Sequence, residues 1–295
     1  MRNKDTMTTA TTTPALQARN LSVGYGGANI ITDLNVSIPT GEFTVIVGPN
    51  ACGKSTLLRS LARVLPAQGT VLLQGEDIHS MGTKEIARIM GLLPQSPTAP
   101  DGIVVYDLIS RGRYPHQGIL GRWTHEDEVA VERAMAKARV SGLRDKRIDE
   151  LSGGQRQRVW LAMVLAQDTP VVLLDEPTTY LDITHQVEVL NLARDLQQQG
   201  VTVVAVLHEL TLAFRYATNL VVMKQGTIVA EGQVTEVVTE SLLKEVYALD
   251  CLLVDDPETG RPIVVPKRSR LRPSCCIKNM YKSALFDAAL GVEKH

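Results

Sequence analysis

The sequence predicts an α/β fold with a mainly parallel sheet that is covered by helices on both faces. Residues 43–47, 171–174 and 201–207 are runs of apolar and β-branched residues, which is typical of strands buried on both sides. Segments with apolar residues at helical spacing lie between these runs. Because strands that alternate with helices usually form one parallel sheet, we expect the three runs to belong to such a sheet.

Shorter segments complete this prediction. Between Leu16 and Val47, brief alternating segments broken by Gly and Pro predict antiparallel strands beside the central sheet, and residues 70–73 predict another. Residues 91–95 predict a short strand that leads into a loop, and residues 220–230 predict a hairpin. Four further segments show helical character: residues 76–90, 126–140, 152–166 and 186–199.

A glycine-rich segment directly follows the strand predicted at 43–47. Residues 48–55 fit the pattern G-x-x-x-x-G-K-[ST], and a helical segment comes next. In this setting backbone N–H groups surround phosphate oxygens, Lys54 adds a full positive charge, and the Ser55 hydroxyl binds Mg²⁺. The pattern therefore predicts a nucleotide phosphate site formed by Gly48, Pro49, Asn50, Ala51, Cys52, Gly53, Lys54, Ser55 and Thr56.

Two adjacent carboxylates end the strand predicted at 171–174. Parallel strands present their carboxyl ends at one edge of a sheet, so Asp175 should lie beside the glycine-rich loop and hold Mg²⁺ together with Ser55. Glu176 follows, points elsewhere, and is placed to orient or deprotonate an attacking water. These carboxylates predict that the bound nucleotide is hydrolysed.

A second candidate anion site lies at the start of the helix predicted at 152–166. Ser152 is a suitable N-cap, and the glycines that follow it leave backbone N–H groups exposed at a helix start. A helical insert, expected at about 96–150, separates this site from the glycine-rich loop. We therefore expect a head-to-tail dimer in which nucleotide lies between two chains.

Composition limits the other classes of function. The chain has 295 residues, 44% of them hydrophobic, and a net charge of −1, so no overall field favours nucleic acid. Its four cysteines have neither zinc-site spacing nor the pattern of a disulfide framework, which favours a reducing compartment. The N-terminus lacks the apolar segment of a secretory signal, and no apolar run approaches the roughly 20 residues that span a bilayer.

With these motifs the chain resembles the ATP-binding cassette (ABC) family over residues 16–240. The resemblance implies an ABC ATPase with a RecA-like parallel-sheet core, an antiparallel β subdomain and an α-helical subdomain. The expected organisation is a disordered lead, an ATPase domain whose helical subdomain lies at about 96–150, a C-terminal region and a tail of unknown role. The boundaries in that order are 1–14, 15–250, 251–268 and 269–295.

The resemblance also implies roles for single residues. Tyr25 would stack on adenine, Gln95 would sense Mg²⁺ and water, and His208 would contact the γ-phosphate. Asp182, in the segment Tyr-Leu-Asp that ends there, would cross the dimer interface as part of the D-loop. Glu209 is a departure, since the family often has Asp there. The family's signature motif, which touches ATP on the partner subunit, would comprise Ser152, Gly153, Gly154 and Gln155.

Several segments resemble importers of ferric siderophores, namely residues 111–118, 122–123, 177–186, 212–217 and 251–266. This branch implies ATP and Mg²⁺ as cofactors and a position on the cytoplasmic face of the cell membrane. Its partners would be a second copy of the chain, membrane permease subunits and, indirectly, a substrate-binding lipoprotein or periplasmic protein, with no nucleic acid. Import of haem, cobalamin or a metal ion is an alternative. A non-transport cassette ATPase is disfavoured, because the chain has no long heptad insert and only one phosphate-loop motif.

Overall fold

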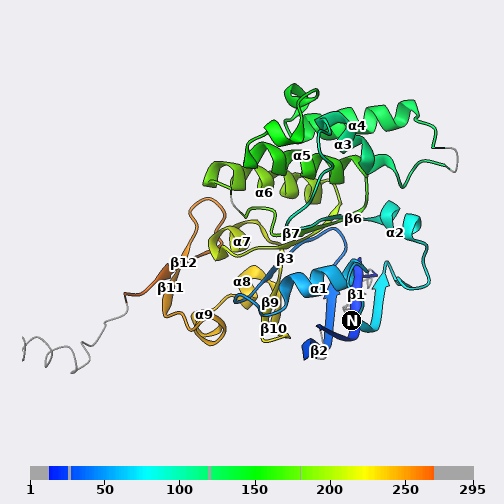
Figure 1. The fold of residues 1–295 in the computed structure, drawn as a ribbon. Coiled ribbons are helices and arrows are strands. Elements are labelled where there is room, and N and C mark those ends of the chain that lie inside the picture. Colours follow the sequence, from blue (N-terminus) through cyan, green and yellow to red (C-terminus); the bar gives the residue numbers. More distant parts are fainter. Residues whose placement is uncertain (1–12, 26–27, 119–120, 180, 269–295) are drawn as a thin grey trace, which may run out of the picture.

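The computed structural model describes residues 13–25, 28–118, 121–179 and 181–268, with only the backbone described for Tyr25 and Ala28. Nearly all of the predicted lead and the whole of the tail 269–295 lie outside these residues, as does Tyr180 of the predicted D-loop. Figure 1 shows the described chain as a layered structure with a sheet at its centre and the helices of residues 105–166 above it.

The central sheet has six strands in the order β10-β9-β3-β8-β7-β6. The pairings of β3 with β8 and β9, of β7 with β8, and of β6 with β7 are all parallel, whereas β10 runs antiparallel to β9 in a hairpin. The three runs predicted as buried strands are therefore neighbours in one sheet, as expected. The strand bounds are β3 Phe43–Val47, β6 Met90–Leu93, β7 Val171–Asp175, β8 Thr202–Val206, β9 Asn219–Lys224 and β10 Thr227–Gln233.

Side chains alternate between the two faces of this sheet and enter two hydrophobic cores. Val45 and Val203 belong to the core that contains the helices α3 to α7, while Ile46 and Val204 belong to the core formed with α1 and the antiparallel sheet. This alternation explains the continuous apolar runs, because both faces of each strand are covered. The helices are α1 Lys54–Leu61, α2 Thr83–Ile89, α3 Val105–Ser110, α4 His125–Lys137, α5 Gly153–Ala166, α6 Ile183–Gln198, α7 Leu210–Tyr216, α8 Val234–Val237 and α9 Glu240–Tyr247.

A second, antiparallel sheet packs below α1 in the order β2-β1-β4-β5. Its strands are β1 Leu16–Tyr25, β2 Ala28–Ile38, β4 Gln68–Leu73 and β5 Glu76–Asp77. The prediction of one helix over residues 76–90 is wrong in its first half. There Gln74 and Gly75, both with positive φ, close a hairpin, and Asp77 accepts hydrogen bonds that form a turn before α2.

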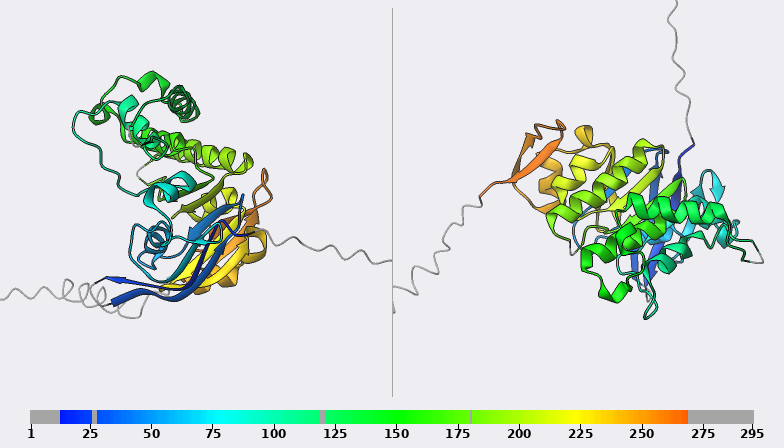
Figure 2. Two further views of the ribbon diagram at one scale, coloured as in Figure 1. Left: turned by 90° about the vertical axis from the view of Figure 1, so that its right-hand side faces the viewer. Right: turned by 90° about the horizontal axis from the view of Figure 1, so that it is seen from above.

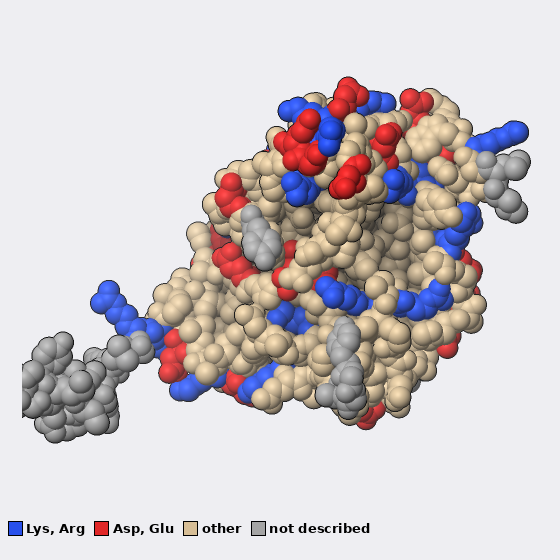
Figure 3. Space-filling view, in the orientation of Figure 1, with Lys and Arg blue, Asp and Glu red and all other residues tan. Residues whose placement is uncertain are grey.

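The remaining elements lie in two places. Three short 3-10 helices, Arg111–Arg113, Ser141–Leu143 and Ile148–Glu150, lie among the helices above the sheet. At the other end of the molecule, β11 Cys251–Asp255 and β12 Pro262–Pro266 form a two-stranded hairpin beside α7 (Figure 2). On the face seen in Figure 3, acidic and basic side chains are mixed over the upper helices, in keeping with the nearly neutral net charge.

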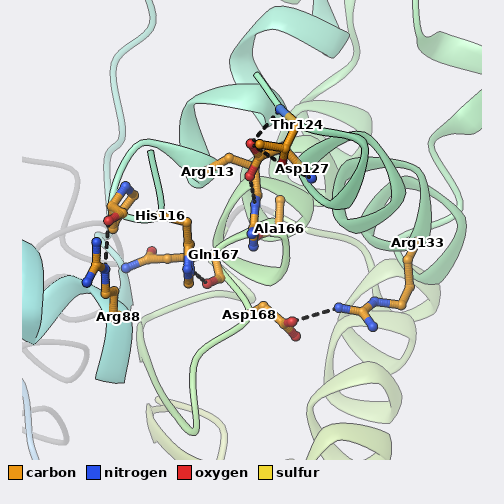
Figure 4. A network of polar contacts seen from close by, with 10 residues as sticks. Arg88, Arg113, His116, Thr124, Asp127, Arg133, Ala166, Gln167 and Asp168 are labelled. Carbon is orange, nitrogen blue, oxygen red and sulfur yellow. Dashed lines mark hydrogen bonds and ion pairs between the residues drawn. The ribbon is translucent and has the colours of Figure 1, made fainter. Parts of the chain in front are cut away.

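A buried ion pair anchors the upper helices (Figure 4). The Arg113 guanidinium donates from Nε to Asp127 Oδ1 (2.9 Å) and from Nη1 to the carbonyl of Ala166 at the end of α5 (2.9 Å). Both charged residues are buried. Burial alone would raise the pKa of Asp127, but hydrogen bonds from Arg113 and Thr124 outweigh it and hold the pKa below its ordinary value. Arg113 thereby ties the start of α4 to the end of α5.

Replacing Arg113 with Met should lower the free energy of unfolding by about 3 kcal/mol, because the Asp127 carboxylate would remain buried without its cation. Urea denaturation at pH 7 measures the loss. Arg133→Met is the matched control, since it breaks an exposed pair with Asp168 and should cost less than about 1 kcal/mol.

The effect of Arg113→Met should also depend on pH. Because the folded-state pKa of Asp127 is depressed, the stabilisation is complete above the unfolded pKa of about 3.9 and is lost as the pH falls through the folded value. Equal losses for the two variants at pH 7 would contradict the anchoring role.

Candidate functional site

The loop between β3 and α1, residues 48–53, is shaped by glycines at its two ends. Gly48 has φ 156°, and a Cβ there would lie 2.3 Å from the backbone oxygen of Met223, so this position has no room for a side chain. Gly53, the N-cap of α1, has φ 106°, a left-handed value that favours glycine. The loop therefore turns directly onto the α1 N-terminus, where backbone N–H groups lack intrahelical partners.

A pocket of about 400 Å³ opens above this loop. It is lined by Ile30, Asn50, Ala51, Cys52, Gly53, Lys54, Ser55, Thr56, Gln95, Glu176 and His208. The structure thus brings seven of the nine predicted phosphate-loop residues together with the three residues predicted to be catalytic. Gly48 and Pro49 are not among the lining residues, but their carbonyls accept hydrogen bonds from Lys54 Nζ (2.8 and 2.9 Å).

Lys54 is 5% exposed. Burial lowers the pKa of its ammonium group, and this is opposed by the nearby Cys52, Glu176 and Asp175. Its present acceptors are neutral carbonyls, so an anionic phosphate oxygen in the pocket would be a stronger partner.

Glu176 is the centre of the polar contacts in the pocket. Its Oε2 accepts hydrogen bonds from Gln95 Nε2 (2.6 Å) and Thr179 Oγ1 (3.1 Å), and its Oε1 lies 2.5 Å from His208 Nε2. Its backbone φ of 53° is unusual for a residue with a side chain. A carboxylate held in this way beside a phosphate pocket can orient and deprotonate a water molecule.

Asp175, one residue earlier, is fully buried and has a different environment. Its Oδ2 receives both Nε and Nη2 of Arg59 from α1, each at 3.0 Å. Within the described part of the chain, its Oδ1 has no hydrogen-bond partner. A buried carboxylate oxygen without a donor is costly unless a cation or water completes it, so the site fits Mg²⁺ bound through this carboxylate.

The predicted signature residues form the start of α5 at some remove from this pocket. Ser152 caps the helix by accepting a hydrogen bond from the Gln155 N–H, and Gln155 Oε1 accepts one from the Ser152 N–H. Ser152 and Gly153 are exposed. Neither they nor Gly154 and Gln155 are among the lining residues of the pocket, so the two predicted anion sites are separate surfaces of this chain.

Residues 31–179 match the family of ABC transporters. The chain belongs to the ABC transporter family. Ferric enterobactin transport ATP-binding protein FepC of Escherichia coli is 51% identical over 85% of this chain and 93% of its own length. The siderophore transport ATP-binding protein YusV of Bacillus subtilis is also 51% identical, over 85% of this chain and 92% of its own.

The fold of this ABC ATPase agrees with that assignment. A solved structure described as an inward-facing transporter of the metal-chelate type superposes with a TM-score of 0.75 and 27% identity, covering 88% of this chain and 99% of the other. As a member of the family, the chain binds and hydrolyses ATP. Among the described residues, none of the helices is both long and apolar enough to cross a membrane.

Three residues that contact or line the candidate site of this ABC ATPase, Arg59, Thr179 and Ile30, were not predicted from the sequence. Arg59 carried a signal, since it lies four residues after Ser55 on α1 and so shares its face of the helix. For Thr179 the sequence held no such signal, because its contact with Glu176 depends on a turn in which Glu176 has a positive φ. Ile30 lines the pocket from β2, a strand that sequence patterns place only in the neighbouring sheet.

Proposed function

We propose that this chain is the ATP-hydrolysing subunit of an ABC importer that takes up a ferric siderophore, with the residues of the described pocket as its catalytic site. The observation that carries the catalytic part is the position of the Glu176 carboxylate, which lies in the pocket with Lys54 and in contact with both Gln95 and His208. The cargo rests on the relatives, whose names refer to ferric enterobactin and siderophore transport.

ATP binding begins at the loop. Lys54 would exchange the carbonyls of Gly48 and Pro49 for phosphate oxygens, while the N–H groups of residues 50–56 surround the β- and γ-phosphates. Tyr25, of which only the backbone is described, would stack on the adenine ring. These contacts hold the γ-phosphate beside Glu176.

Hydrolysis requires a water molecule aligned with the γ-phosphorus. Glu176 accepts a proton from this water as its oxygen bonds to phosphorus, the bond to the bridging oxygen breaks, and ADP leaves. His208 and Gln95, which now contact Glu176, would move to the γ-phosphate and to the water. Both side chains already line the pocket, so the change requires only a local movement of each.

Mg²⁺ would be held by Ser55, Asp175 and Gln95, with phosphate oxygens completing its coordination. When bound, it neutralises charge on the phosphates. Asp175 Oδ1, which has no hydrogen-bond partner among the residues that the structure describes, supports this assignment, and Arg59 holds the other carboxylate oxygen.

A second copy of the chain would complete each site. Ser152, Gly153 and Gly154 present the exposed start of α5, and in a head-to-tail dimer this surface would cover ATP bound to the other chain. Gln155 would support the helix start, and Asp182 would lie at the interface between the copies. ATP would then bind the closed dimer more tightly than the separated chains, whereas ADP and phosphate would not. Only such a difference in affinity between two states can drive the opening and closing of the dimer.

The dimer would act on permease subunits from the cytoplasmic face of the membrane. Gln95 lines the pocket and lies in the chain segment that connects β6 to the helices of residues 105–150, so closure around ATP could be passed to a permease through these helices. A substrate-binding lipoprotein or periplasmic protein would deliver cargo to the opposite side. The domain boundaries 1–14, 15–250, 251–268 and 269–295 remain predictions.

Replacing Glu176 with Gln should leave ATP binding intact but lower kcat for ATP hydrolysis at least about 100-fold, because the amide cannot accept a proton. The variant should therefore accumulate as an ATP-bound dimer. Light scattering with and without ATP and Mg²⁺ measures the dimer, and a phosphate-release assay measures turnover.

Glu128→Gln, an exposed change on α4, is the control and should behave as the native chain. Native turnover in Glu176→Gln would show that the catalytic residue is wrongly assigned.

Growth of cells with a ferric siderophore as the sole iron source should require Lys54. A strain that carries Lys54→Ala in place of the native chain should take up no radiolabelled siderophore iron, since the phosphates lose their buried cation. Uptake of haem and of cobalamin should be unchanged in the same strain. Loss of haem or cobalamin uptake with normal siderophore uptake would assign the importer to that cargo instead.

A further inference from the structure

His185, in the first turn of α6, contacts residues from both motifs that are proposed to face a second chain. Its ring Nδ1 lies 2.7 Å from Asp182 Oδ1, and the same carboxylate oxygen accepts the His185 backbone N–H at 3.0 Å. The backbone N–H of His185 and then its ring hold the pKa of the Asp182 carboxyl below its ordinary value. The carboxylate can only accept, so Nδ1 carries a proton and Nε2 is directed elsewhere.

The opposite edge of the His185 ring lies against the signature motif. A Cβ built on Gly154 would be 3.1 Å from His185 Cδ2 and 3.3 Å from its Nε2, so the ring occupies the space beside the glycine. Gly154 is the second residue of α5, directly after the exposed Gly153. One imidazole thus joins the start of α5 to the N-cap of α6.

Other polar contacts of α5 and α6 lie farther from the first turns of the two helices. Arg158 of α5 donates to Glu188 of α6 at 2.8 Å, and Glu188 also lies 3.5 Å from Arg139. Gln157 donates to the carbonyl of Pro177 (3.0 Å), which fixes the chain between Glu176 and Asp182 from the α5 side. The Arg158–Glu188 pair joins the two helices farther along, whereas the His185 side chain lies against both Gly154 and Asp182.

We propose that His185 is a positioning residue that acts through Gly154 and Asp182 to hold the signature motif and the D-loop in one arrangement, ready to receive ATP bound to a second chain. This inference rests on the proposed function. His185 need not touch the nucleotide, and its side chain is 33% exposed. Because the phosphate pocket is lined by other residues, loss of His185 should spare ATP binding by the single chain.

Three variants separate the two contacts of the ring. His185→Phe keeps an aromatic ring beside Gly154 but cannot donate to Asp182. His185→Asn keeps a donor at the position of Nδ1 but loses the edge that meets Gly154. His185→Ala lacks both contacts, and His125→Asn changes an exposed histidine on α4 as the control.

Each variant is made in the native chain for measurement of kcat and in the Glu176→Gln chain for measurement of ATP-dependent dimerisation. We expect His185→Ala to lower kcat about tenfold and to raise the ATP concentration for half-maximal dimerisation about tenfold, since misplaced groups at a reacting site have effects of at least this size. His185→Phe and His185→Asn should fall between His185→Ala and the native chain. ATP affinity under conditions that keep the chain monomeric, and the melting temperature, should stay within error of the control.

Native kcat and native dimerisation in His185→Phe or in His185→Asn would show that one of the two contacts is dispensable and would overturn the proposal. A loss of monomer ATP affinity or of melting temperature in step with kcat would also overturn it, because His185 would then be only structural. If the native chain fails to hydrolyse ATP, or Glu176→Gln fails to dimerise, it is the proposed function that fails.

Discussion

The site depends on one constraint, which is that the parallel strands of the central sheet end at the same edge. Lys54 follows β3, Gln95 follows β6, Glu176 follows β7 and His208 follows β8, so four segments far apart in sequence meet in one pocket. The buried faces of these strands hold that edge rigid from two cores. The glycine-rich loop can then be built largely from backbone groups, because its ends are fixed by β3 and α1.

This constraint explains why much of the site could be predicted from sequence. A strand that is covered on both faces appears as a continuous apolar run, so the position of its carboxyl end could be identified. The place of Glu176 beside the loop followed from such a strand end, whereas Gln95 and His208 were assigned to the site through the resemblance to the ABC family. The Arg59–Asp175 pair could not be deduced in the same way, because it depends on how α1 lies across β7. Similarly, the helix predicted at 76–90 was too long at its start, because Asp77 accepts the His79 N–H in a local turn that takes the place of the first helical turns.

The structure also distinguishes rigid from adaptable parts of the site. Arg59 fixes the carboxylate of Asp175, and close packing of Gly48 against the backbone of Met223 fixes the start of the loop. By contrast, Lys54, Gln95 and His208 hold partners within the protein that ATP and water can replace. The buried Arg113–Asp127 pair keeps the helices of residues 105–150 attached to the C-terminal end of α5. The N-terminal end of the same helix carries the signature residues. A movement of α5 would therefore move both the signature residues at its start and the helices attached to its end.

The central claim is that each ATP is held between the phosphate loop of one chain and the signature motif of another. The most direct test mixes two variants in the Glu176→Gln background: Lys54→Ala, which lacks the loop cation, and Gly153→Asp, which places a like charge where phosphate should bind, at a position with open space for a side chain. Neither should dimerise alone, whereas the mixture should form a heterodimer that holds one ATP, since only one of its two sites combines an intact loop with an intact signature. A mixture that forms no heterodimer, or a Gly153→Asp variant that still dimerises alone with ATP, would contradict the claim.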